Sequence, residues 1–283
     1  MTHTAAVATA LGAGAAVGEA PGGVAAVDKA LAVLMAFRPG ESGLSLTELA
    51  ARTGLYKSAV LRLLASLAHA GLVQRQGDTG WRPAPTGERP AGDAAGAPMG
   101  RGPRGRAGGA DWALGPAVLH LHRLYADQNP QAQRRVAALQ ALVHTTGESA
   151  AFYVLHGPAP HRTRLCLHRV DSPHPIRDHL REGDVLPLDR GTGGHVLVAF
   201  SPPGRCAVPE SADLQGVRAQ GHCARVGDRL AEVAGISAPV FGAGGGLVGA
   251  LTLTMPAHRY TVDAIAPVRA AAAALSREEG FLG

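Results

Sequence analysis

Basic and hydroxyl side chains share one face of the segment from Lys57 to Ala70. Their three- and four-residue spacing is that of a helix face, which comprises Lys57, Ser58, Leu61, Arg62 and Ala65. Polar groups near the start of a helix can reach phosphates and base edges in the major groove of DNA. The opposite side is apolar and predicts a face that packs into a core, formed by Val60, Leu63, Leu64 and Leu67. The segment is therefore a candidate recognition helix.

Shorter helical segments precede the candidate recognition helix. We predict a helix over 27–37, ended by Arg38-Pro39-Gly40, and a second over 46–52. Ser45 is the expected N-cap of the second helix, and Glu48 completes a capping box. The turn around Gly54 then joins two helices into a helix-turn-helix. Periodicity alone is equally typical of an ordinary amphipathic hairpin.

Two short strands after the hairpin favour a winged helix over that alternative. Leu72–Arg75 follows Gly71 as a first wing strand, and Asp111–Leu114 is the second. Between them, 76–110 is rich in Gly, Pro and Arg and buries too little apolar surface to offset its ordering entropy, so we predict a mobile wing insertion. Its arginines either bind the DNA backbone or form a merely solvated loop: Arg82, Arg89, Arg101, Arg104 and Arg106. The DNA-binding surface that we assign comprises Ser45, Thr47, Lys57, Ser58, Leu61, Arg62 and Arg75.

A second group of residues has the chemistry of a small anion site. Thr192-Gly193-Gly194 stands at the start of a short helix predicted over 193–200, and backbone N–H groups at a Gly-rich helix start bind anions. Strand 247–255 places Leu247, Leu251, Leu253 and Met255 on one face, which should pack on helices. Its other face offers the hydroxyls of Thr252 and Thr254 to a cavity. Ordinary β-propensity and a plain turn are the alternative explanations.

The length and composition fit two domains without a disulfide or metal framework. A chain of 283 residues suits two domains, and its formal charge of +5 is compatible with nucleic acid. The three cysteines are widely spaced without a C-x-x-C pair, which fits a reducing cytoplasm. No apolar run approaches the roughly 18 residues of a membrane span. We expect 1–23 to be a disordered extension.

The pattern beyond the wing predicts an α+β fold. We expect a linking helix within 116–130, a helix over 131–146, strands over 150–156, 164–170, 174–180, 184–188, 235–241 and 247–255, and a final helix over 261–279. Pro267 is expected to bend that helix, and 201–218 is expected to lack one. The predicted domains are a winged helix (24–115), a linking helix (116–130) and an antiparallel-sheet effector domain (131–283).

These motifs together resemble the IclR family of bacterial transcription regulators. The helix-turn-helix is followed, in the family's order, by Leu114-Gly-Pro116, Arg169-Val-Asp-Ser172, Leu186-Pro-Leu188, Ala238-Pro-Val-Phe241 and the run 247–254. The likeness covers about Val24 to the C-terminus. It implies an N-terminal winged helix, a linking helix and a C-terminal GAF-like effector domain, in dimers that often pair into tetramers.

The resemblance also implies which residues line the effector pocket. They are Thr192, Gly193, Arg225, Gly235, Thr252 and Thr254. A guanidinium at Arg225 beside a helix N-terminus favours a carboxylate effector. The chain departs from the family's pattern at Tyr56, where Pro is usual, and at Leu61, where a polar or aromatic residue is common. The wing insertion and a shortened 201–218 are further departures.

We therefore predict a cytoplasmic DNA-binding regulator, either a repressor or an activator, and not an enzyme. Its expected partners are double-stranded operator DNA, a small organic-acid effector and further copies of the chain in a homodimer or tetramer, without a membrane. No motif joins a nucleophile to a base and no ligand cluster suits a metal, so we assign no catalytic residue, metal or cofactor. Two alternatives stay open: a metabolite-binding module or enzyme whose N-terminal helices only dimerise, and a regulator that has lost its sensing function.

Overall fold

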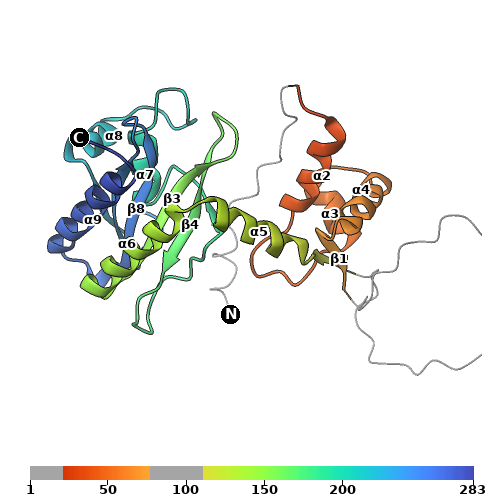
Figure 1. Ribbon diagram of the computed structural model, residues 1–283, viewed down its shortest axis with the longest axis horizontal. Coiled ribbons are helices and arrows are strands. Elements are labelled where there is room, and N and C mark those ends of the chain that lie inside the picture. Colours follow the sequence, from red (N-terminus) through yellow and green to blue (C-terminus); the bar gives the residue numbers. More distant parts are fainter. Residues whose placement is uncertain (1–21, 77–110) are drawn as a thin grey trace, which may run out of the picture. The chain divides into compact units, whose positions relative to one another are not determined.

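The computed structural model describes residues 22–76 and 111–283 and divides into two compact units. The first unit ends at Tyr125, so the chain passes into the second within helix α5 (Ala117–Gln128), as can be followed in Figure 1. The predicted extension (1–23) and wing insertion (76–110) lie almost wholly outside the described residues, and so do the five wing arginines. Each unit has a hydrophobic core of its own.

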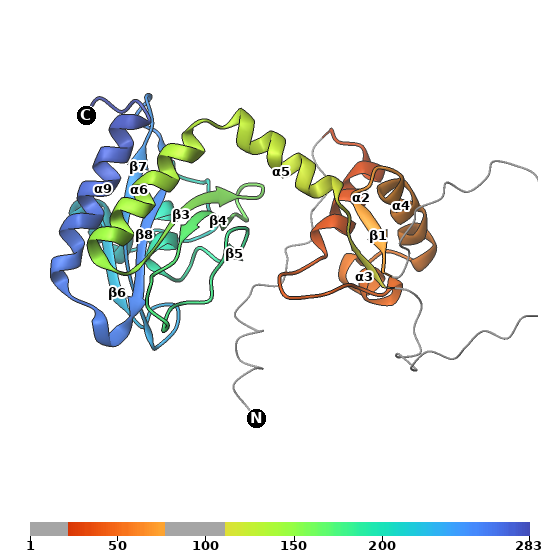
Figure 2. The same ribbon diagram turned by 60° about the horizontal axis from the view of Figure 1, so that its bottom comes forward.

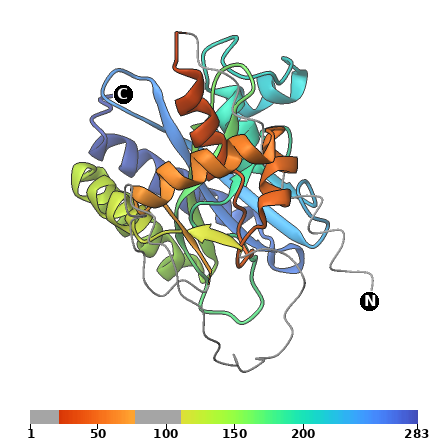
Figure 3. The same cartoon turned by 90° about the vertical axis from the view of Figure 1, so that its right-hand side faces the viewer.

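The first unit is a winged helix built on three helices, drawn in red to orange in Figure 3. They are α2 (Ala25–Met35), α3 (Leu46–Thr53) and α4 (Lys57–His69). The antiparallel strands β1 (Val73–Arg75) and β2 (Trp112–Leu114) follow, as the two predicted wing strands. The helix-turn-helix therefore lies where the sequence pattern placed it.

The capping chemistry that the sequence predicted for α3 is present. Ser45 Oγ accepts a hydrogen bond from the Glu48 backbone, and the Glu48 carboxylate accepts one from the Ser45 backbone. Gly54 ends α3 with φ of 69°, in the left-handed region that favours glycine. These two features fix the turn that leads into α4.

The core of this unit explains why the face of α4 opposite its apolar side stays free. Leu49 of α3, Val60 and Leu64 of α4, and Val33 of α2 are completely buried, and Trp112 of β2 covers them at 7% exposure. Because Val60 and Leu64 of α4 are used for this packing, the basic side of the helix faces away from this core.

Helix α2 differs from the sequence prediction in which face it buries. The apolar residues whose spacing predicts this helix are Val27, Leu31, Leu34 and Met35, yet Val27, Leu31 and Met35 are 53%, 42% and 59% exposed. Val33 is buried instead, with Leu34 partly buried beside it. The helix thus carries more apolar surface than the core of its own unit can cover.

The second unit is a six-stranded antiparallel sheet with helices on both faces. Its elements are α6 (Gln131–Thr146), β3 (Ser149–His156), β4 (Thr163–Val170), β5 (Val185–Leu186), α7 (Thr192–Ala199), α8 (Ala212–Gln220), β6 (Cys223–Val226), β7 (Val233–Phe241), β8 (Leu247–Pro256), the 3-10 turns η1 (Ala257–Arg259) and η2 (Val262–Ala264), and α9 (Ile265–Glu278). The strand order is β5-β4-β3-β8-β7-β6. Helices α6 and α9 lie side by side over one face, as Figure 2 shows, whereas α7 and α8 pack on the other.

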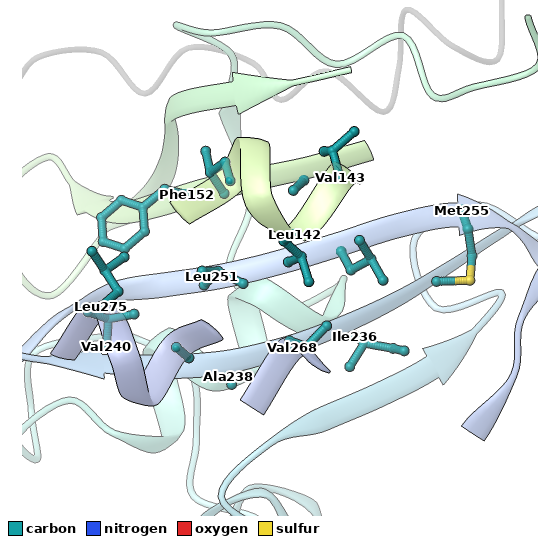
Figure 4. Close-up of a cluster of buried hydrophobic side chains, with 14 of the residues drawn as sticks. Leu142, Val143, Phe152, Ile236, Ala238, Val240, Leu251, Met255, Val268 and Leu275 are labelled. Atoms are coloured by element: carbon teal, nitrogen blue, oxygen red, sulfur yellow. The ribbon is translucent and has the colours of Figure 1, made fainter. Parts of the chain in front are cut away.

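The core under α6 and α9 uses the strand faces that the alternating pattern predicted. Leu251, Leu253 and Met255 of β8 contact Leu142 of α6 and Val268 of α9 within one buried cluster, part of which Figure 4 shows. Leu247 is the exception, because the pairing of β7 with β8 shifts register between Val240 and Phe241. This irregularity turns Leu247 toward the α7 side and Val248 toward the α9 side.

Several predicted elements of this unit were wrong. Helix α8 occupies part of the segment expected to lack a helix, and 174–180 is not a strand although Leu180 is buried. Pro267 lies in the first turn of α9 and so needs no bend, because proline is tolerated where backbone N–H groups lack partners. Strand β6 was not predicted. Helix α7 begins at Thr192, so Thr192 and both glycines form its first turn.

Candidate functional site

The exposed face of α4 carries the residues assigned to DNA. Lys57, Ser58, Leu61 and Arg62 are all exposed, Leu61 by 45%. Neither Lys57 nor Arg62 has a hydrogen bond or ion pair within the described ranges. Tyr56, which stands just before the helix, is 86% exposed and extends this surface. Two cations without partners at the start of a free helix face are suited to phosphate contacts.

The other residues assigned to DNA are less uniform. Thr47 is exposed on the first turn of α3. The Ser45 hydroxyl is engaged in the capping box at the start of α3. The Arg75 guanidinium lies 5.2 Å from the centroid of the Trp112 ring, which orients it at the base of the wing.

The six residues predicted for the effector pocket line one cavity of the second unit. The cavity lies at the first turn of α7, beside β7 and β8, and is bordered by Thr192, Gly193, Arg225, Gly235, Thr252 and Thr254. The same cavity has seven further lining residues, which are Tyr153, Arg164, Leu180, Gly191, Asp228, Arg229 and Val233. Glycine is needed at 235, because a Cβ there would come 2.7 Å from Thr192 Oγ1. A Cβ at Gly193 would press on Thr252 and Tyr153.

A chain of three buried hydroxyls runs beneath the first turn of α7. Ser237 Oγ donates to Thr192 Oγ1 at 2.7 Å and lies 2.7 Å from Thr252 Oγ1. Because a hydroxyl has only one proton, Thr252 must donate to Ser237, and the Thr192 proton stays free for an acceptor in the cavity. Ser237 is completely buried and was not predicted, since β7 gave no reason to single it out.

Arg164 is the second residue that the sequence reasoning missed. Its side chain projects from β4 and is only 2% exposed. Nη1 donates to the carbonyl oxygens of Arg190 and Gly191, at 2.8 and 3.1 Å, in the loop that leads into α7. The guanidinium lies 5.2 Å from the Tyr153 ring centroid. Burial lowers the pKa of Arg164, because its charge has lost most of its hydration.

The remaining charged side chains of the cavity are each paired with a side chain outside its lining. Asp228 accepts from the Gly191 N–H at 2.5 Å and lies 2.9 Å from His195 Nε2. Arg225 donates to Asp213 of α8 and to the Cys223 sulfur, so it is held at the rim of the cavity. Outside these contacts, Arg229 pairs with Asp178 at 2.5 Å.

Comparisons with known proteins agree with this architecture. The profile of the IclR helix-turn-helix domain matches residues 26–77, and that of the bacterial transcriptional regulator IclR C-terminal domain matches residues 211–277. The chain belongs to the IclR family. This IclR-family chain is 27% identical over 280 residues to the glycerol operon regulatory protein of Streptomyces griseus, covering 91% of the chain and 97% of that protein.

Solved structures of the family have the same fold. An IclR transcriptional regulator of Silicibacter sp. superposes with a TM-score of 0.68 at 24% identity, over 90% of this chain and 96% of that one. An IclR homologue of Microbacterium hydrocarbonoxydans, crystallised with 4-hydroxybenzoate, gives a TM-score of 0.67 at 16% identity, over 90% and 99%. The chain is therefore an IclR-type transcription regulator with a DNA-binding helix-turn-helix and an effector-binding C-terminal domain, and not an enzyme.

Other chemistry finds little support in the part of the chain that the structure covers. Burial raises the pKa of the Cys166 thiol to about 12 and raises that of Cys223, so both remain protonated and unreactive. Within residues 22–76 and 111–283, no three metal-binding side chains gather into a cluster. No helix within these ranges has the length and apolar character needed to span a membrane.

Proposed function

We propose that this IclR-family regulator binds operator DNA through the exposed face of α4 and that a small carboxylate in the α7 cavity controls the binding. One observation carries the proposal: α4 packs its buried side against the core and presents Lys57 and Arg62, whose side chains have no partner among the described residues. Lys57, Ser58, Leu61 and Arg62 would approach the major groove, while Thr47 and Arg75 contact the backbone.

Salt dependence of DNA affinity tests the first half of the proposal. Each phosphate contact releases condensed counterions, so log K should fall linearly with log salt concentration for operator DNA identified by footprinting the regulator's own upstream region. The double variant Lys57→Ala and Arg62→Ala should weaken DNA binding. It should also make the slope of log K against log salt concentration shallower, by the amount expected for the loss of about two phosphate contacts. Lys29→Ala, an exposed lysine on α2, is the matched control and should leave the slope unchanged. If the affinity for DNA showed no dependence on salt concentration, the alternative would be favoured, in which the N-terminal helices of a metabolite-binding module or enzyme only dimerise.

We further propose that the regulator is at least a dimer joined through its winged-helix unit. Val27, Leu31 and Met35 of α2 are largely exposed, and so are Leu119 and Leu121 of α5, by 72% and 54%. Exposed apolar side chains on two helices of one small unit, which on α2 follow the i, i+4 spacing of a stripe, are typical of an interface. A symmetric pair would bring two α4 helices to half-sites about 34 Å apart or a multiple of that spacing.

The carboxylate effector is proposed from the donors in the cavity. The first turn of α7 offers backbone N–H groups and the Thr192 hydroxyl, and arginines also line the cavity. A carboxylate bound there would bridge α7 to the sheet and shift the population of conformations open to DNA. Thermal shift of the full chain with a panel of small acids tests this, because a ligand that binds only the folded state raises the melting temperature. The absence of any shift, with DNA binding intact, would contradict it.

A further inference from the structure

We propose that Arg164, and not Arg225, holds the carboxylate group of the effector, an inference that rests on the proposed acid-sensing function of the α7 cavity. Sequence patterns direct attention to Arg225, because it matches a pocket position of the family. The contacts that the two arginines make favour Arg164 instead.

The guanidinium of Arg164 has one edge in use and one edge without partners. Nη1 binds the carbonyl oxygens of Arg190 and Gly191. Nε is buried and has no hydrogen-bond partner within the described residues, and Nη2 makes none there either. Nε and Nη2 together form the side-on fork with which arginine binds both oxygens of a carboxylate. A buried donor without an acceptor destabilises the fold, so a bound carboxylate would relieve this penalty.

Arg164 is also the cavity arginine that has no carboxylate of its own. Arg225 is paired with Asp213, and Arg229 is paired with Asp178. The remaining acid, Asp228, is occupied by the Gly191 N–H and His195. No ion pair joins Arg164 to any acid among residues 22–76 and 111–283. A buried cation generally needs a counter-charge, and an anionic ligand is the group that can supply it.

Three donors converge on the space beside Arg164. A Cβ built on Gly191 or Gly194 would lie 2.5 and 2.6 Å from nitrogens of this guanidinium, so the guanidinium is inserted directly under the first turn of α7. The N-terminus of that helix carries partial positive charge, and the Thr192 hydroxyl has its proton free. Guanidinium, helix N-terminus and hydroxyl thus form one anion cradle.

The size of the cavity restricts the ligand to a compact acid. Its volume is about 30 Å³, whereas a single water needs roughly 10–15 Å³ on the same measure. A carboxylate with a short chain fills that space, and any longer chain must extend past the partly exposed Arg225. We therefore place the carboxylate group innermost, with the rest of a small acid directed toward Arg225.

Calorimetric titration of the full chain tests the assignment, with acetate, glycolate, lactate and 3-hydroxybutyrate as probes, their amides as neutral partners, and inorganic phosphate as the competing oxyanion. We expect at least one acid to bind the wild type and its amide to bind much more weakly. Arg164→Gln should weaken the acid by about 10- to 100-fold and leave the amide unchanged, because only the charged hydrogen bonds are lost. Arg164→Lys should show an intermediate loss, since it keeps the charge but not the fork.

Arg190→Gln is the matched control, because it removes a neighbouring exposed arginine that does not line the cavity. It should retain the acid preference. Equal acid affinity in wild type and Arg164→Gln, or loss of the preference in Arg225→Gln alone, would overturn the role of Arg164 while leaving acid sensing intact. Binding of phosphate but no acid would overturn the ligand class, and no binding at all would overturn acid sensing itself. If Arg164→Gln fails to fold, as judged by lost operator binding and melting, the Arg164→Lys comparison decides between these outcomes.

Discussion

Arg52 holds the carboxylate of Glu41 with both terminal nitrogens, at 2.7 and 2.6 Å. The same guanidinium donates to the Ala36 carbonyl oxygen at the end of α2. One side chain of α3 thereby fixes the connection between α2 and α3, on which the orientation of the helix-turn-helix depends. The fork lowers the pKa of Glu41, chiefly through the hydrogen bond from Arg52.

Acid should therefore weaken the winged-helix unit through Glu41. A carboxyl whose pKa is lower in the folded than in the unfolded state stabilises the fold above its usual pKa of 4.5, and that stabilisation is lost as the pH falls through the folded value. We expect the free energy of unfolding to fall as the pH drops below about 4.5, and Glu41→Gln to make the fall shallower. Both tryptophans, Trp81 and Trp112, precede the second unit, so urea unfolding followed by tryptophan fluorescence monitors this part of the chain.

Asp111→Asn is the control for that measurement, because the Asp111 side chain makes no hydrogen bond or ion pair among the described residues. It should keep the wild-type slope. Glu48, whose pKa is lowered by its hydrogen bonds to Ser45, leaves a residual slope in Glu41→Gln. A wild-type slope in Glu41→Gln would mean that the fork does not persist in solution.

Removal of the Ser237 hydroxyl should uncouple α7 from the sheet. Ser237→Ala leaves the buried Thr192 and Thr252 hydroxyls without the bridge between them, which costs about 1–3 kcal/mol of stability. It also allows the Thr192 proton to turn away from the cavity, so acid affinity should fall several-fold. Chemical denaturation and calorimetric titration measure the two effects.

Ser201→Ala tests whether any serine near α7 would give the same result. Its hydroxyl donates to the Leu197 carbonyl oxygen within one chain segment and does not line the cavity. Acid affinity should be unchanged in this variant. An unchanged affinity in Ser237→Ala as well would show that the hydroxyl chain plays no part in binding.

Gly115 should not tolerate a side chain, because it lies against the Gly71 backbone where β2 leads into α5. A Cβ at Gly115 would come 2.9 Å from the Gly71 carbonyl carbon and still closer to its oxygen, which accepts from Ala117 N–H at 3.1 Å. Backbone cannot yield as a flexible side chain can, so Gly115→Ala should destabilise the unit by about 1–3 kcal/mol. Gly216→Ala in α8 is the opposite case, with open space around the added methyl, and should be neutral or stabilising. An equal loss of melting temperature in Gly115→Ala and Gly216→Ala would refute the steric argument.

The sequence was sufficient to predict the bounds of an element where its apolar periodicity and its terminal residues mark the same end. Helix α6 was predicted to the residue, since its stripe and Gly147 mark the same end. Helix α8 was missed because only Leu214 and Val217 face the core and Gly216 interrupts its middle. Helix α8 is stabilised by packing against α7, and a short helix held in this way has no local sequence pattern that predicts it.

The cavity was predictable in outline but not in its key contacts. In β4, Arg164 and Cys166 are buried on the α7 side, while the neighbouring Leu165 and Leu167 are only partly buried, so the polarity pattern suggests the reverse orientation. Only the fold reveals that Arg164 is buried beneath α7 and that Ser237 bridges Thr192 and Thr252. Both arise from strands far apart in the sequence, and a single sequence does not encode such pairings visibly.

Charge placed on the exposed apolar stripes should separate the proposed dimer. Leu31 of α2 and Leu121 of α5 are 42% and 54% exposed, so glutamate at either position is tolerated by the monomer but costly in an apolar interface. We expect Leu31→Glu and Leu121→Glu to halve the mass measured by light scattering at micromolar concentration. Each should also lose affinity for a two-half-site operator while keeping its melting temperature. Leu282→Glu makes the same change at a side chain that is 98% exposed in the other unit, and it should leave the mass unaltered. A wild-type mass in both stripe variants would place the interface elsewhere on the chain.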